Sequence, residues 1–183
     1  MNMNLLKTRP GAEIRTPDGT VIRPTRFAAL EYGWYTPDGE QMRKSTTFYV
    51  VDKYKGAYDL YLDMENGAVY VGAVRQRAVG LYTLHFVSGS SYSDRMTLVH
   101  AMENVAYTYL NNAAYEYFKT TTKGLVEAAE KQAKADAQQA QIDAIKAADQ
   151  VRKERLSSLG IESDGKSLTA EQIDSLLAIV AGA

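Results

Sequence analysis

Apolar and polar residues alternate with a period of two along the first half of the chain, up to about Ser88. The apolar runs are short, contain many β-branched and aromatic residues, and are separated by Gly, Asp and Asn; they read TTFYVVDKY, AYDLYLD, AVYVGAV and VGLYTLHFV. This alternation is typical of antiparallel strands with one buried face. Asn66 and Gly67 lie between two of the runs, where they predict a hairpin closed by a two-residue type I′ turn.

The tetrapeptide TPDG occurs twice, at residues 16–19 and 36–39. Pro presets the backbone for the second position of a turn, Asp suits the third, and Gly accepts the positive φ at the exit of a type I turn with a G1 bulge. The similarity ends after the two glycines, which argues against a full internal repeat. We therefore interpret the copies as two similar hairpin turns. The alternative is a pair of loops that line one rim and bind one partner.

The hydrophobic period changes from two to 3.6 near Ser93, which we expect to be the N-cap of a helix with Asp94 in its first turn. A core-facing side of this helix would carry Met96, Val99, Met102, Ala106, Leu110, Ala113 and Tyr117. A second line lies beside that face and consists of Tyr107, Asn111, Tyr115 and Phe118. The helix is therefore apolar on more than one side.

Residues 122–159 are rich in Ala, Gln, Lys and Glu, with Gly124 as the only glycine, and this composition predicts one long helix. Its apolar seam comprises Val126, Ala129, Ala133, Ala137, Ala140, Ala144, Ala148 and Val151. The steps repeat about every eleven residues, a period of about 3.67 that favours a straight or slightly right-handed coil. Alanine lets a partner helix come close but buries little area, so such a seam stabilises a lone helix only weakly. Ion pairs from Glu127 to Lys131 and from Glu130 to Lys134 are expected on the flanks.

Residues 159–161, Leu-Gly-Ile, predict the C-cap of the long helix. A second helix is expected to start at Thr169, with Gln172 completing a capping box and Leu168 packed on Ile173. The apolar stripe of this short helix consists of Ile173, Leu176, Leu177 and Val180. The long helix either packs back on the β domain, pairs with a copy of itself or binds another protein, and the short helix either folds back on it or docks on another subunit.

The whole pattern predicts an α+β protein: an N-terminal antiparallel β meander closed by a helix, followed by a long Ala-rich helix and a short C-terminal helix. The expected domains are residues 1–120, with the Tyr-rich helix packed on the sheet, and residues 121–183, a helical extension.

Composition narrows the function classes. The chain has 45% hydrophobic and 23% charged residues, which are globular values. It contains no Cys, so disulfides, thiolate zinc sites and Cys nucleophiles are excluded. No signal peptide or long apolar run is evident, so we expect no membrane partner and a soluble, cytoplasmic or intracellular location. Thirteen tyrosines are about twice the usual number, and Tyr is common at protein interfaces.

The net charge of the chain is −1, with an excess of about +2 over residues 1–92 and about −3 over residues 93–183. Neither half carries the strong positive excess that nonspecific binding to a polyanion needs.

No residue pattern predicts a catalytic, metal or cofactor site. His85 lies in an expected strand and His100 in an expected helix with Glu103 nearby, and one such pair does not make a metal site. The segment IESDGKSLTAEQI fails the calcium-loop spacing. The segment SGSSYSD is expected to join a strand to a helix N-terminus, where an anion could bind, but it lacks a Walker lysine and the dinucleotide glycines. There is no Gly-x-Ser-x-Gly motif.

Nucleic-acid binding has more support, because RPTRF, MRKSTTFYV and AVRQRAVGLYTLHF interleave Arg with aromatic residues on an expected sheet. The residues that would contact a single strand are Arg23, Arg26, Arg43, Arg75 and Arg77, with the aromatic residues Trp34, Tyr35 and Tyr82. Balancing acidic residues and the lack of an RNP-like motif make solvated strand faces the simpler interpretation.

We therefore expect a noncatalytic assembly protein whose helices pair in an oligomer or bind a larger complex. A phage virion or assembly component suits a chain of this general style, although no motif identifies one. The alternative is a single-stranded nucleic-acid-binding module that uses the Arg and aromatic residues of the β domain, and an enzyme comes third.

Overall fold

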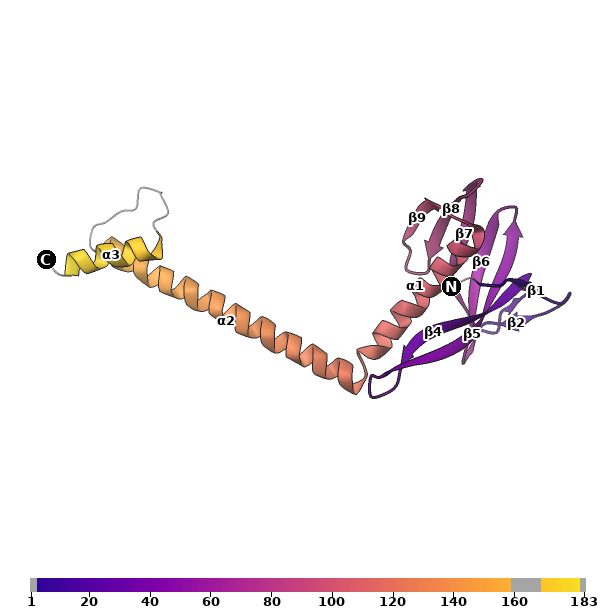
Figure 1. Ribbon diagram of the computed structural model, residues 1–183, viewed down its shortest axis with the longest axis horizontal. Helices are drawn as coiled ribbons and strands as arrows, with labels where there is room; N and C mark the ends of the chain where they lie inside the picture. Colours follow the sequence, from indigo (N-terminus) through magenta and orange to yellow (C-terminus); the bar gives the residue numbers. More distant parts are fainter. Residues whose placement is uncertain (1–2, 159–168, 182–183) are drawn as a thin grey trace. The chain divides into compact units, whose positions relative to one another are not determined.

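The computed structural model describes residues 3–158 and 169–181 and divides the chain into two compact units, Met1–Val126 and Glu127–Ala183 (Figure 1). The strands are β1 (Leu6–Lys7), β2 (Ile14–Arg15), β3 (Val21–Ile22), β4 (Arg26–Tyr35), β5 (Gln41–Tyr54), β6 (Ala57–Met64), β7 (Gly67–Ala78), β8 (Leu81–Phe86) and β9 (Ser91–Arg95). The helices are α1 (Leu98–Phe118), α2 (Thr122–Ser158) and α3 (Ala170–Ala181).

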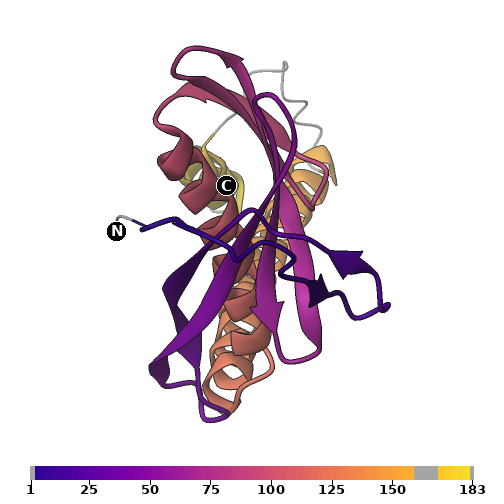
Figure 2. The ribbon, with the colours of Figure 1, turned by 90° about the vertical axis from the view of Figure 1, so that its right-hand side faces the viewer.

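The first unit is built on a seven-stranded antiparallel sheet. Strands β4 to β9 pair in chain order, and β1 adds at the free side of β4, which gives the order β1-β4-β5-β6-β7-β8-β9. Strands β2 and β3 form a separate two-stranded hairpin, which projects sideways from the meander in Figure 2. With α1 packed on the sheet and α2 and α3 following it, the predicted α+β class and element order are confirmed.

The core lies between α1 and one face of the sheet. Phe48 and Val50 of β5 are fully buried, because alternate residues of a strand point to the same face. They stand opposite Leu62 and Leu60 of β6 in the register of the sheet. The helix contributes Ala101, Met102, Val105, Ala106 and Leu110, all without exposed surface. The helical period of 3.6 and the strand period of two thus meet in one apolar layer.

Both TPDG segments are hairpin turns, as predicted. Gly19 N–H donates to the Thr16 carbonyl and Gly39 N–H to the Thr36 carbonyl, each at 2.9 Å. The two glycines have φ of 85° and 92°, the positive values expected at the exit of such a turn. The first turn joins β2 to β3 and the second joins β4 to β5.

The hairpin between β6 and β7 is confirmed, but its predicted type I′ turn at Asn66 and Gly67 is wrong. Met64 pairs with Gly67, so the loop residues are Glu65 and Asn66. A type I′ turn needs positive φ at both loop positions, and no described residue other than glycine has positive φ. Gly67 instead opens β7 with φ of 115°.

The predicted start of α1 at Ser93 is also wrong. Ser93 belongs to β9, where it pairs with Thr83 of β8. The N-cap is Thr97, whose hydroxyl accepts the His100 N–H at 3.2 Å. The segment SGSSYSD therefore forms the turn between β8 and β9 and most of β9. It is not the predicted connection from a strand to a helix, so it does not place an anion site at a helix N-terminus.

The predicted long helix is confirmed as α2, with 37 residues. Of its expected ion pairs, neither Glu127 with Lys131 nor Glu130 with Lys134 lies within pairing distance, although all four side chains are described. Its i,i+4 contacts are amide-to-carboxylate hydrogen bonds instead, from Gln132 to Asp136 at 2.7 Å, from Gln139 to Asp143 at 2.9 Å and from Gln150 to Glu154 at 2.9 Å.

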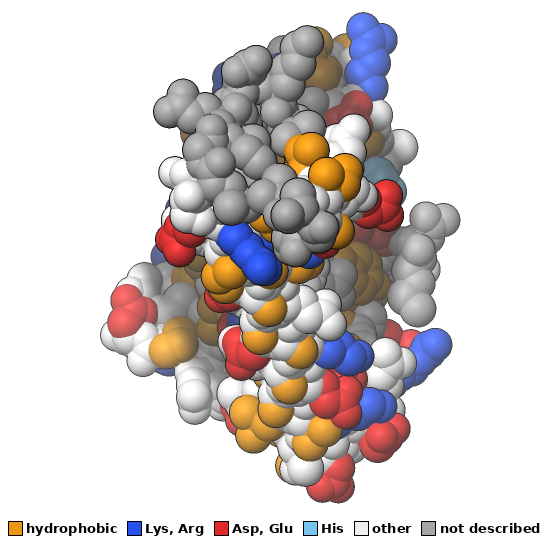
Figure 3. Space-filling model, turned by 90° about the vertical axis from the view of Figure 1, so that its left-hand side faces the viewer, with side chains coloured by type: hydrophobic (Ala, Val, Ile, Leu, Met, Phe, Trp, Pro, Cys, Tyr) orange, Lys and Arg blue, Asp and Glu red, His pale blue; other side chains and the backbone are white. Residues whose placement is uncertain are grey.

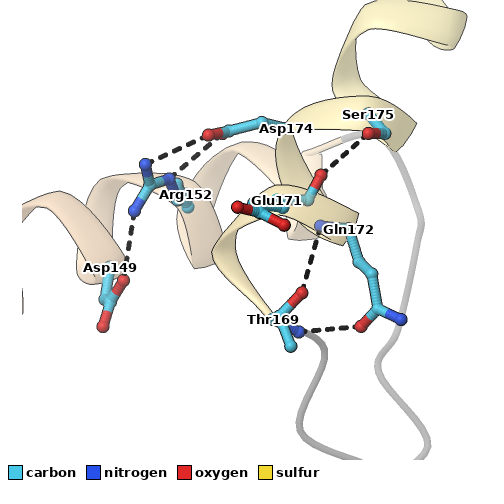
Figure 4. Close-up of polar contacts among 7 residues, drawn as sticks. All are labelled: Asp149, Arg152, Thr169, Glu171, Gln172, Asp174 and Ser175. Carbon is cyan, nitrogen blue, oxygen red and sulfur yellow. Dashed lines mark hydrogen bonds and ion pairs between the residues drawn. The ribbon is translucent and has the colours of Figure 1, made fainter.

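The predicted capping box of the C-terminal helix is confirmed. Thr169 N–H donates to Gln172 Oε1 at 2.9 Å, and Gln172 N–H donates to Thr169 Oγ1 at 3.3 Å (Figure 4). The predicted C-cap at residues 159–161 and the packing of Leu168 on Ile173 involve residues outside the described part of the chain. None of the described helices is long and apolar enough to cross a membrane.

Candidate protein-interaction site

The long helix α2 exposes nearly all of its surface. Every residue from Leu125 to Val151 is exposed to solvent. A helix in a folded protein normally gains most of its stability from packing one face against other elements. Over this stretch, no described element of the chain supplies that packing.

The predicted Ala seam runs along one side of α2. Val126 and Val151, near its two ends, have exposed fractions of 53% and 62%. Between them the exposed seam residues are Ala129, Ala133, Ala137, Ala140, Ala144 and Ala148. Apolar side chains in orange stand among charged ones on this helix in Figure 3.

Three larger apolar residues of α2, Leu125, Ile142 and Ile145, are exposed away from the seam and were not predicted from the sequence. Ile142 is 39% exposed and Ile145 is 63% exposed. Ile142 is two positions from Ala140, which is about 200° around an α-helix, so it lies on the opposite side. The helix therefore presents apolar atoms on two sides. A search for larger aliphatic residues at exposed helical positions, rather than for a single repeating line, would have found them.

The C-terminal helix α3 lies against the end of α2. Arg152 of α2 donates from Nε to Asp174 Oδ1 and from Nη2 to Asp174 Oδ2, both at 3.1 Å, and from Nη1 to Asp149 at 3.3 Å (Figure 4). The hydrogen bonds and charge of Asp174 raise the pKa of Arg152 above its ordinary value. Of the predicted stripe, Ile173, Leu176 and Leu177 are half-buried. The side chain of Val180 lies outside the described atoms.

The first turn of α2 is held by the second TPDG turn. Thr122 N–H donates to the Pro37 carbonyl at 3.2 Å and Lys123 N–H to the Asp38 carbonyl at 3.3 Å. Thr121 caps the helix, since its hydroxyl accepts the Gly124 N–H at 3.2 Å. Residues 122–126 of α2 belong to the first unit, and the rest of the helix belongs to the second.

The arginines predicted to bind nucleic acid are mostly paired with carboxylates. The distances are 2.9 Å for Arg23 to Glu13, 2.6 Å for Arg26 to Asp52, 3.6 Å for Arg43 to Glu31 and 3.0 Å for Arg75 to Asp59. Arg77 donates from Nε to the Thr83 hydroxyl at 3.0 Å. Each pair cancels positive charge that a phosphate backbone would need.

The aromatic residues predicted for the same site do not form an open stacking platform. Tyr82 is only 8% exposed and belongs to the core. Trp34 stacks on Tyr117 with ring centroids 5.3 Å apart, and Tyr35 packs on Phe118 at 4.7 Å. Of all the residues proposed for nucleic acid, Trp34, Tyr35 and Arg43 are brought together, because they line one cleft between the β4–β5 hairpin and α1.

The two histidines lie in different elements, His85 in β8 and His100 in α1. His100 Nδ1 is 3.8 Å from Glu103 Oε2, and Oε1 of the same carboxylate accepts the buried Met3 N–H at 2.7 Å. Within residues 3–158 and 169–181, no group of three or more His, Asp or Glu side chains is arranged to hold a metal ion.

Comparison with protein-family models, curated proteins and solved structures finds no match to this chain. A functional proposal for this chain therefore rests only on its sequence and structure.

Proposed function

We propose that the chain is a noncatalytic assembly protein and that α2, with α3 at its end, is the element through which it binds protein, in the first instance a second copy of itself. The observation that carries the proposal is the uninterrupted exposure of residues Leu125 to Val151 on a helix with apolar atoms on two sides. Such a surface loses contact with water when a neighbouring helix covers it.

The two sides of α2 would contribute differently to binding. The Ala seam allows the backbone of a neighbouring helix to come close along a nearly straight path. Ile142 and Ile145 supply the larger apolar area, and full burial of one such side chain contributes on the order of 1.5–3 kcal/mol. A helix with two apolar sides can have neighbours on both, as helices inside a bundle do.

Single-stranded nucleic acid is the alternative partner, supported by the gathering of Trp34, Tyr35 and Arg43 at one cleft. It is the weaker hypothesis because the candidate arginines already have carboxylate or hydroxyl partners.

Light scattering of the full chain over a range of concentrations tests the proposal. The seam variant carries Ala137→Glu and Ala140→Glu, which place charge on the apolar line. The matched control carries Ala128→Glu and Ala135→Glu, the same exchange at exposed positions of the same helix off the seam. We expect the native chain and the control to form oligomers, and the seam variant to show the monomer mass of 20.2 kDa.

Circular dichroism at the same concentrations shows whether the substitutions alter helix content, and because both variants replace two Ala by two Glu, the expected change in helix propensity is the same. A native chain that stays monomeric at every concentration contradicts self-assembly. Equal dissociation of the seam variant and the control contradicts the role given to the seam.

A further inference from the structure

The two edges of the seven-stranded sheet are protected very differently. At one edge, β9 has five residues, Ser91–Arg95, all exposed and none of them aliphatic. Short, polar and charged edge strands resist pairing with another chain. At the other edge, β1 covers only Arg26 and Phe27 of β4. From Ala28 to Tyr35, β4 has no strand partner on this side among the described residues.

The uncovered part of β4 has one charged residue, Glu31, and lacks two other features that block pairing. It contains no Pro, and it pairs with β5 without a register shift. Backbone groups in an antiparallel pair point alternately toward and away from the neighbouring strand. Thr36 N–H donates to the Glu40 carbonyl across the β4–β5 hairpin, so residues in step with Thr36 face β5. Their neighbours, Glu31, Gly33 and Tyr35, therefore direct their N–H and C=O groups to the open edge.

One contact supports this assignment independently. The Tyr107 hydroxyl of α1 donates to the Glu31 carbonyl at 3.3 Å. A carbonyl bonded to β5 would belong to the β4–β5 ladder, so the contact with a side chain of α1 fits a Glu31 carbonyl that points away from β5.

A cleft of 760 Å³ runs beside this edge. The β4–β5 hairpin forms one side of it, and Tyr107, Asn111, Ala114 and Tyr115 of α1 form the other. Tyr107, Asn111 and Tyr115 of the second line on α1 thus line the cleft, whereas Phe118 packs on Tyr35. The volume falls within the range of about 300–1,000 Å³ that binding clefts usually have.

We propose that the open edge of β4 binds an extended segment of a partner protein, which adds to the sheet as one more strand. The backbone of the segment pairs with Gly33, Tyr35 and the Glu31 N–H, while the Glu31 carbonyl keeps its bond from the Tyr107 hydroxyl, and the cleft accepts the side chains of the segment. Alternate side chains of a strand point to opposite faces. Those facing α1 meet Tyr107 and Tyr115 and are therefore apolar or aromatic in the partner.

The side chains on the other face of the added strand meet charged residues. Arg43 and Glu31 are exposed there, 3.6 Å apart, and favour polar or charged neighbours. The expected partner segment thus alternates apolar and polar residues. A second copy of this chain fits less well, since a copy pairing through its own β4 brings its own α1 to the same edge. This surface does not involve α2 or α3, so the test of peptide binding is independent of the test of the proposed assembly function.

The probe is a library of random twelve-residue peptides displayed on phage and selected on the full chain. Selected peptides are synthesised and titrated into the isotope-labelled full chain, observed by NMR. We expect peptides with alternating apolar and polar residues, and slowed hydrogen exchange at the amides of Glu31, Gly33 and Tyr35 when the peptide is bound. Methylation of the peptide nitrogens that face β4 should abolish binding, because it removes the donors.

Gly33 offers a matched pair of variants. A side chain at Gly33 meets no atom within 4 Å, so Gly33→Ala fits and keeps the edge N–H. Gly33→Pro removes that N–H without taking a hydrogen bond from the β4–β5 pair. We expect peptide affinity to fall at least tenfold for Gly33→Pro and to change less than twofold for Gly33→Ala.

A second pair keeps the test sharp if Gly33→Pro does not fold. Asn111 lines the cleft and Asn112, its exposed neighbour, does not. Asn111→Trp should weaken binding at least tenfold and Asn112→Trp should not. The proposal is overturned if no peptide is selected, or if peptides bind both members of each pair equally. Protection of the edge amides that rises with protein concentration in the absence of peptide also overturns it, in favour of pairing between copies.

Discussion

At Gly124, in the first turn of α2, the backbone of the α1–α2 connection leaves no room for a Cβ atom. A Cβ added there would lie 2.0 Å from the Phe118 carbonyl oxygen, a backbone atom that cannot rotate away. Replacing Gly by Ala inside a helix usually stabilises it by about 1 kcal/mol. Here we expect the opposite sign, a loss of about 1–3 kcal/mol, because the connection must shift to admit the methyl group.

Chemical denaturation measures the change in the free energy of unfolding. Gly33→Ala is the control, since its methyl group meets open space, and its effect should stay within about 0.5 kcal/mol. A Gly124→Ala variant as stable as the native chain would show that the close approach at Phe118 relaxes without loss.

Residue-level reasoning from the sequence succeeded where one residue decides the local geometry. Pro and Gly fix the backbone of both TPDG turns. The spacing of Thr169 and Gln172 identifies the capping box at the start of α3. It failed where two outcomes use the same residues. Ser93 can cap a helix or continue an edge strand, and pairing with β8 decides between them. Asn66 and Gly67 are compatible with more than one hairpin turn, and only the strand register decides which residues form the loop.

At the scale of elements, α1 and α2 are both long helices but lie in opposite environments. Amides in the buried part of α1 open only when the first unit unfolds, whereas exposed α2 can open locally. We expect hydrogen exchange in dilute protein to be fast between Leu125 and Val151 and slow around Met102 and Leu110. Raising the concentration should slow exchange in α2 alone, because assembly covers it.

Mass spectrometry of peptic peptides gives both rates in one experiment. The Ala137→Glu and Ala140→Glu variant is the control, and its α2 exchange should stay fast at all concentrations. Slow exchange in α2 of the dilute native chain would contradict an uncovered helix.

Periodicity predicted the existence of both helices and the length of α2, but not the start of α1 or which sides of the helices make contacts. The search for one repeating line found the Ala seam and passed over Ile142 and Ile145, which break that line. The second line on α1 was visible in the sequence, yet its role depends on β4, an edge strand some eighty residues earlier. Contacts between elements distant in the chain are not encoded in the period of either one.

At the scale of the whole molecule, the two compact units predict two separate unfolding events. Phe48 is fully buried in the first unit, so Phe48→Ala should lower the free energy of unfolding of that unit by about 3–5 kcal/mol. The helical signal of α2 and α3 should melt as before, because only the first turn of α2 has described contacts with the first unit.

Near-ultraviolet circular dichroism follows the aromatic core, and the signal at 222 nm follows total helix. We expect Phe48→Ala to shift the first transition and leave a helical component unchanged. The same shift in both signals would show that the units unfold as one.

The chain carries a single tryptophan, and its position has a practical consequence. Trp34 lines the cleft at the open edge of β4, stacks on Tyr117 and has the Lys44 ammonium group 5.2 Å from its ring centroid. Indole emission depends on such neighbours, so a molecule entering the cleft changes the colour or brightness of one identifiable fluorophore. The protein therefore contains its own optical reporter for that surface, which can be read on the unmodified chain without attaching a dye.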